Sequence, residues 1–155
     1  LGDARGLALS PDGRWVLAAQ RAEGGHELVL LPTGPGETRR VGRPAVVAQG
    51  AAFLPGGERV VISGHTPSAG GRLFTYDLAT SALSPISPEG VTSYFNAMVS
   101  PDGKQAFATG LDGKLTLYPV DGGETRVVPP APGNRPILIS GRPSLALSFS
   151  AAMRW

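Results

Sequence analysis

The chain has 155 residues, of which 41% are hydrophobic and only 17% are charged, and it contains 22 glycines and 15 prolines. This length suits one domain or part of one, and the apolar share argues against a disordered chain, so the glycines and prolines indicate turns in an all-β protein. A net charge of +2 does not favour nucleic-acid binding.

The chain contains no cysteine, which excludes disulfides and thiolate zinc sites and leaves the cellular compartment open. The given residues show no signal-peptide pattern, and the longest weakly polar run, residues 145–153, is too short to span a bilayer; a signal or membrane anchor upstream of Leu1 stays open. We therefore expect no direct membrane insertion by this segment. Because the chain begins at Leu1 without a methionine, we expect it to be a piece of a longer protein.

A corner built from proline and glycine occurs three times along the chain. Ser-Pro-Asp-Gly at 10–13 returns as Leu-Pro-Gly-Gly at 54–57 and intact at 100–103, so the prolines lie 44 and 46 residues apart. Serine first, proline second and glycine fourth are the preferences of a type I turn. A recurrence of this length, with several strands in each unit, indicates the blades of a β-propeller.

The first unit covers about residues 4–43. Its apolar segments and turn residues predict four strands, the last of them a charged outer edge: 5–9, 15–19, 28–31 and 37–41. Arg39, Arg40 and Arg43 form the only basic cluster of the chain, and a solvated strand end explains them without a ligand.

The second unit, about 46–88, repeats this order and ends in a weak edge strand that carries Pro85. Its strands are expected at 50–53, 59–62, 73–78 and 82–86. The third unit, about 92–129, contains the hairpin signal Asp112-Gly113. Its strands are expected at 96–99, 105–109 and 115–118, with a closing segment at 121–127.

A fourth unit, about 134–150, begins and is incomplete. An inner strand is expected at 136–140 and a returning strand at 145–149, but the Pro-Asp pair of the corner is missing between them. We therefore predict a single all-β segment, a partial β-propeller of about three four-stranded antiparallel blades plus an incomplete fourth. Since an open arc exposes a blade face at each end, the rest of a larger propeller or a second copy is expected to close the ring.

The repeats resemble a known family. Leu-Ser-Pro-Asp-Gly-Arg-Trp-Val-Leu-Ala at 9–18, Gly-Glu-Thr-Arg-Arg-Val at 36–41 and Val-Ser-Pro-Asp-Gly-Lys at 99–104 are similar to the WD40-like (PD40) repeat of TolB-type β-propellers. The resemblance covers roughly residues 4–140 and implies a fold rather than one function, because propellers serve many roles. It implies a binding or sensing part of a larger bacterial protein, and it favours an extracytoplasmic location over a cytoplasmic one.

No catalytic or cofactor motif is present in the sequence. It contains no Gly-x-Ser-x-Gly elbow, phosphate loop, zinc helix motif, calcium loop or kinase signature. Asp12 and Asp102 lie on separate hairpins, and we interpret them as turn formers rather than catalytic or metal-binding carboxylates. His26 and His65 occupy equivalent loops, but two histidines are few ligands for a metal site, and we interpret them as surface loop residues. We expect no enzyme activity, no cofactor and no metal.

Propeller topology predicts where a partner would bind. The loops between the second and third strands share a face with the links between blades. The residues expected on this face are Arg21, His26, Arg43, His65, Tyr94, Phe95, Asn96, Asn134 and Arg135. Of these, Arg43, His65, Tyr94, Phe95, Asn96 and Arg135 are our candidate contact residues. Packing of Tyr94 and Phe95 between adjacent blades, rather than contact with a ligand, is the interpretation that the sequence favours for those two aromatic residues.

The sequence therefore predicts a non-enzymatic propeller segment that binds a protein or peptide partner, with a small ligand as the other option. Two alternatives stay open. The chain is an accessory propeller of an enzyme, either the sensor of a serine/threonine kinase or the gate of a prolyl-oligopeptidase-type peptidase, or it is a truncated fragment without a function of its own.

Overall fold

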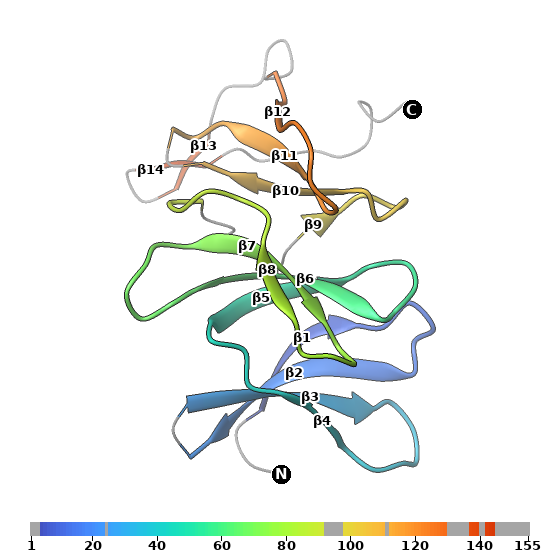
Figure 1. The fold of residues 1–155 in the computed structure, drawn as a ribbon. Coiled ribbons are helices and arrows are strands. Elements are labelled where there is room, and N and C mark those ends of the chain that lie inside the picture. The colour runs from blue at the N-terminus through green and yellow to red at the C-terminus, as the bar shows by residue number, and fades with distance from the viewer. Residues whose placement is uncertain are drawn as a thin grey trace.

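The structure, a computed structural model, describes residues 4–23, 25–91, 98–110, 112–129, 137–139 and 142–144. The described residues form fourteen β-strands in antiparallel sheets (Figure 1), and none belongs to a helix long and apolar enough to cross a membrane. The predicted all-β fold class is confirmed.

Three sheets have four strands each, and in each sheet the strands pair in chain order. The first contains β1 (Ala4–Leu9), β2 (Trp15–Ala22), β3 (Gly25–Pro32) and β4 (Arg39–Gly42). The second contains β5 (Val47–Phe53), β6 (Arg59–His65), β7 (Arg72–Asp77) and β8 (Leu83–Pro85). The third contains β9 (Met98–Val99), β10 (Gln105–Thr109), β11 (Leu115–Pro119) and β12 (Arg126–Val127).

A fourth, two-stranded sheet pairs β13 (Ile137–Ile139) with β14 (Arg142–Ser144). The returning strand thus starts at Arg142, earlier in the chain than predicted, because Ile139 and Arg142 already pair across the shortened corner. The segment 145–149, where the sequence placed this strand, lies outside the described residues.

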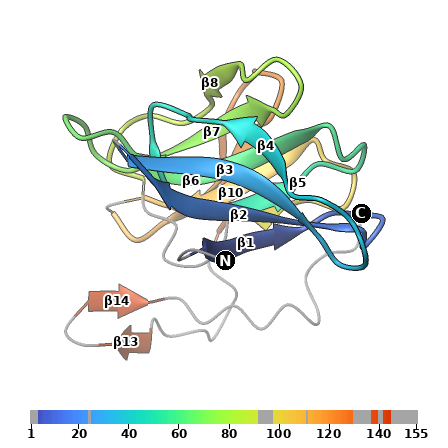
Figure 2. The same cartoon turned by 90° about the horizontal axis from the view of Figure 1, so that it is seen from below.

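The three large sheets stack in chain order, as Figure 1 shows by the change from blue through green to orange. Their first strands contact one another in turn, β1 with β5 and β5 with β9. Figure 2 shows the stack from below, with the first sheet nearest the viewer. Such sheets, with their first strands gathered along one line, are the blades of a propeller.

The second sheet is buried on both faces. Val60 and Ile62 of β6 belong to one core cluster together with Leu17 of the first sheet, whereas Val61 belongs to a second cluster together with Ala106 of the third sheet. Val60, Val61 and Ile62 all have 0% exposure. A strand that is covered on both faces is apolar at every position rather than at alternate ones, which explains the continuous run Val60-Val61-Ile62.

Successive corners also contact one another. A Cβ placed on Gly57 would lie 3.9 Å from Pro11 Cδ, whereas a Cβ on Gly103 would lie 2.4 Å from Pro55 Cδ. In both cases the proline of one corner faces the last glycine of the next corner. The corners of the second and third sheets are therefore packed more tightly than those of the first and second sheets.

This contrast gives a matched pair of glycine variants. Gly13 and Gly103 occupy the same corner position, with φ of +70° and +71°, but nothing lies within 4 Å of a Cβ on Gly13. Gly13→Ala should lower the free energy of unfolding by about 1 kcal/mol, because the left-handed backbone at this position disfavours a side chain. Gly103→Ala should cost about 1–3 kcal/mol more, because the rigid ring of Pro55 has to move. Urea unfolding measures the free energy of unfolding of each variant. Equal decreases for the two variants would contradict the contact between Pro55 and Gly103.

Candidate binding surface

The antiparallel order of the strands gives the stack two opposite ends. One end, which we call the corner face, carries the turns β1–β2 and β3–β4 and their equivalents in the next sheets. The other end, the linker face, carries the β2–β3 loops and the connections between sheets. The sequence placed its candidate contact residues on the linker face.

Two of those candidates are described. Arg43 follows β4 and is exposed; its Nη1 donates to the Glu23 carbonyl (3.0 Å) and its Nε lies 3.8 Å from the Glu27 carboxylate. His65 ends β6, is half-buried and pairs with Val47. Tyr94, Phe95, Asn96 and Arg135, together with Asn134, lie outside the described residues. A contact site on the linker face stays a prediction.

Two further linker-face residues from the sequence prediction are also described. Arg21 and His26 pair across β2 and β3. In the ranges that the structure describes, no three His, Asp or Glu side chains come together in a way that would hold a metal.

The corner face is built on a hydrogen-bonded turn that occurs twice with the same geometry. In the first corner, Ser10 Oγ donates to Asp12 Oδ1 (2.6 Å), the Arg14 amide donates to the same oxygen (3.0 Å), and the Trp15 amide donates to Ser10 Oγ (2.9 Å). The third sheet repeats this network from Ser100 to Gln105 with distances of 2.6, 3.0 and 3.0 Å. The two aspartates are turn formers, as the sequence predicts.

These hydrogen bonds favour the charged form of both carboxylates. The hydroxyl of Ser10 lowers the pKa of Asp12, and the hydroxyl of Ser100 lowers the pKa of Asp102, with the Arg14 and Lys104 amides as the next causes. Each aspartate therefore stays ionised below its ordinary range. A carboxylate held in this way is a poor proton donor at neutral pH.

The first corner presents a tryptophan, Trp15, that the sequence marks only as part of a strand. Trp15 is half-buried and begins β2, two residues before the core residue Leu17, so that its side chain lies on the face of the first sheet that is turned toward the second. The guanidinium carbon of Arg39, on β4, lies 4.3 Å from the centroid of the Trp15 ring. This is a cation–π contact.

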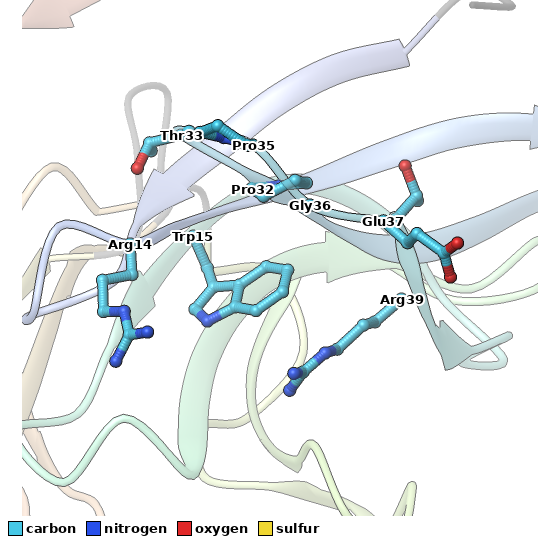
Figure 3. A pocket seen from close by; sticks show the side chains of 10 residues that line it. Arg14, Trp15, Pro32, Thr33, Pro35, Gly36, Glu37 and Arg39 are labelled. Atoms are coloured by element: carbon cyan, nitrogen blue, oxygen red, sulfur yellow. The ribbon is translucent and has the colours of Figure 1, made fainter.

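Trp15 and Arg39 separate two hollows on the corner face and line both of them. The first, of about 550 Å³, lies against the β3–β4 turn and is also lined by Arg14, Glu37 and residues 32–36. Figure 3 shows Arg14 and Arg39 on either side of the Trp15 ring in that view. The second, of about 610 Å³, lies between the corners of the first and second sheets.

The equivalent place between the second and third sheets is bridged by an ion pair. Arg59 begins β6 as Trp15 begins β2, and its Nη1 lies 2.7 Å from Asp121 Oδ1 in the third sheet. The Arg59 guanidinium lowers the pKa of Asp121, which keeps the pair charged. Trp15 cannot form such a bridge, and Ala79 stands in the second sheet where the third has Asp121.

Comparisons with solved structures agree with this architecture. The putative TolB from Agrobacterium tumefaciens matches with a TM-score of 0.64 and 15% identity over 81% of this chain and 48% of that one. The fold is that of a β-propeller. An oligogalacturonate lyase solved with manganese matches with a TM-score of 0.60 and 16% identity, over 82% of this chain and 35% of that one.

A third propeller is the domain of the Trilobed protease from Pyrococcus furiosus, which matches with a TM-score of 0.56 and 14% identity over 87% of this chain and 45% of that one. The predicted partial propeller is thus confirmed, and the chain spans less than half the length of each of these structures. Identities this low show the fold alone. No protein-family model and no curated protein matches the sequence.

The lowered pKa values of the corner carboxylates make the stability of the blades pH-dependent. An aspartate whose pKa is lower in the folded state contributes stability that is complete above its unfolded value of about 3.9 and is lost as the pH falls through the folded value. The double variant Asp12→Asn, Asp102→Asn keeps the acceptor oxygen but cannot titrate. Between pH 5 and pH 2 the double variant should lose less stability than the unchanged chain, as measured by the urea midpoint of unfolding. If the two midpoints fall equally with pH, the pKa values of Asp12 and Asp102 are not lowered by folding.

Proposed function

We propose that this chain is a non-enzymatic part of a larger propeller protein that binds a peptide or protein partner, or a small ligand, through its corner face. The observation that carries the proposal is the Trp15–Arg39 pair, which borders one hollow at the β3–β4 turn of the first blade and a second hollow at the junction of the first two blades. Tryptophan and arginine are enriched among the side chains that dominate binding energies.

The scaffold supports this proposal. Trp15 is held in place because its amide donates to Ser10 Oγ and because it pairs with Pro32 across β2 and β3. A large aromatic side chain with few rotatable bonds, fixed on a sheet, loses little conformational entropy when a ligand covers it. The carboxylates near it accept turn hydrogen bonds and stay ionised, which suits recognition better than proton transfer.

A second candidate role is that of an accessory propeller of an enzyme. It is favoured by the similarity to the propeller domain of a protease and by the partial coverage of each matched structure. A coding sequence that continues into a kinase catalytic loop or a Gly-x-Ser-x-Gly elbow would support this role. The corner face would then bind a partner on behalf of the attached domain.

Peptides selected from a random 12-residue phage library against the whole chain test the proposal. Trp15→Ala should weaken the selected peptides at least about thirtyfold in calorimetric titration, which is the loss expected for a dominant aromatic contact. Trp15→Phe, which keeps a ring, should retain most of the affinity. Thermal unfolding of each variant checks that the fold is intact.

The controls are Arg43→Ala and His65→Ala on the linker face. They should leave the affinity within about twofold. If these two variants abolish binding and Trp15→Ala does not, the corner-face proposal is wrong and the linker face predicted from the sequence binds the partner.

A further inference from the structure

The hollow between the first two blades has an apolar floor. We call it the inter-blade groove. Leu30, Phe53 and Leu78 line it, and all three are partly buried residues that pack against the core shared by the first and second sheets. Trp15 completes the floor at the corner. The groove is therefore the point where this core opens to solvent on the corner face.

The rim of this groove is acidic. Asp12, Glu58 and Asp77 line it, and Arg39 is the one cation among the described residues that line it, so these residues carry a formal charge of −2 in a chain whose net charge is +2. Hydrogen bonds from Thr80 lower the pKa of Asp77, as those from Ser10 lower that of Asp12. The acidic rim thus stays charged at neutral pH.

The arginines close to this rim do not neutralise its carboxylates. Arg59 adds to the lowering of the Asp77 pKa, but its guanidinium is hydrogen-bonded to Asp121 of the third blade. Arg14 adds to the lowering of the Asp12 pKa and lines the neighbouring hollow. Glu58 is exposed, and within the described ranges its carboxylate makes no hydrogen bond or ion pair.

Arg39 indicates which kind of side chain the floor of the groove can bind. Its guanidinium stacks on Trp15 at 4.3 Å, so a planar cation of the chain itself already occupies part of the aromatic surface. Arg39 is exposed, and no carboxylate forms an ion pair with it among the described residues. A cation from a ligand could therefore take its place at little cost.

We infer that the inter-blade groove binds an Arg or Lys side chain of a basic peptide segment, with Arg39 as the competing group of the chain itself. The inference rests on the proposed function and names its ligand class. Charge complementarity selects the occupant: an apolar stem covers Leu30 and Phe53, and the cation reaches the carboxylates of the rim. An acidic segment would be repelled by the same rim.

The test uses three fluorescein-labelled peptides with one scaffold, Gly-Ser-Gly-X-Leu-X-Gly-Ser-Gly, in which X is arginine, serine or glutamate. Fluorescence anisotropy with the whole chain should show that the arginine peptide binds at least about tenfold more tightly than the serine peptide, since two cations meet the acidic rim. The glutamate peptide should bind less tightly than either.

Single charge changes locate the contact. Glu58→Gln should weaken the arginine peptide about threefold, the size expected for an exposed ion pair. Glu124→Gln, which removes the same charge outside the groove, should have no effect. Arg39→Gln should strengthen binding about threefold, because it removes the competing cation. A purely structural role of Arg39 would weaken binding instead.

The outcomes separate the inference from the proposed function. If the glutamate or serine peptide binds as well as the arginine peptide and depends on Trp15, the surface binds peptides but the inference of a basic ligand is wrong. If the phage-selected peptides do not depend on Trp15 either, the proposed function fails as well. If Glu58→Gln and Glu124→Gln weaken the arginine peptide equally, the cation does not enter the groove.

Discussion

The burial of β6 between two neighbouring sheets is the interaction on which this structure depends. An apolar sheet face has to be buried against another element, and here the core clusters are shared between neighbouring sheets. Ile62 contributes to the cluster shared with the first sheet and Val61 to the cluster shared with the third. This stacking positions the turns and side chains of the corner face relative to one another.

The two junctions differ where they reach the corner face. Between the second and third blades, Pro55 lies against Gly103 and the Arg59–Asp121 ion pair bridges the gap. Between the first and second, the facing proline and glycine are farther apart, and Trp15 stands where the next blade has Arg59. A repeated architecture thus produces one junction that an ion pair bridges and one that is hollow, aromatic and acidic, and this difference is the basis of the proposed binding surface.

The sequence predicted what is decided locally and missed what depends on pairing between distant strands. The corner at 10–13 could be predicted because serine, proline, aspartate and glycine each favour one position of the same turn. The stacking of Arg39 on Trp15 could not, because it requires the register of β4, which shifts by a bulge next to Val29. Arg39, Arg40 and Arg43 therefore resembled a solvated strand end, and the sequence placed the contact residues on the linker face.

Methyl NOE spectroscopy on the whole chain tests the stacking of the blades most directly. The account predicts that the Ile62 methyl groups give NOEs to Leu17 and Leu28 of the first blade, and that the Val61 methyl groups give NOEs to Ala106 and Ala108 of the third. NOEs from both residues to the same blade, or from neither to a neighbouring blade, would contradict the buried position of β6 and with it the junction that forms the groove.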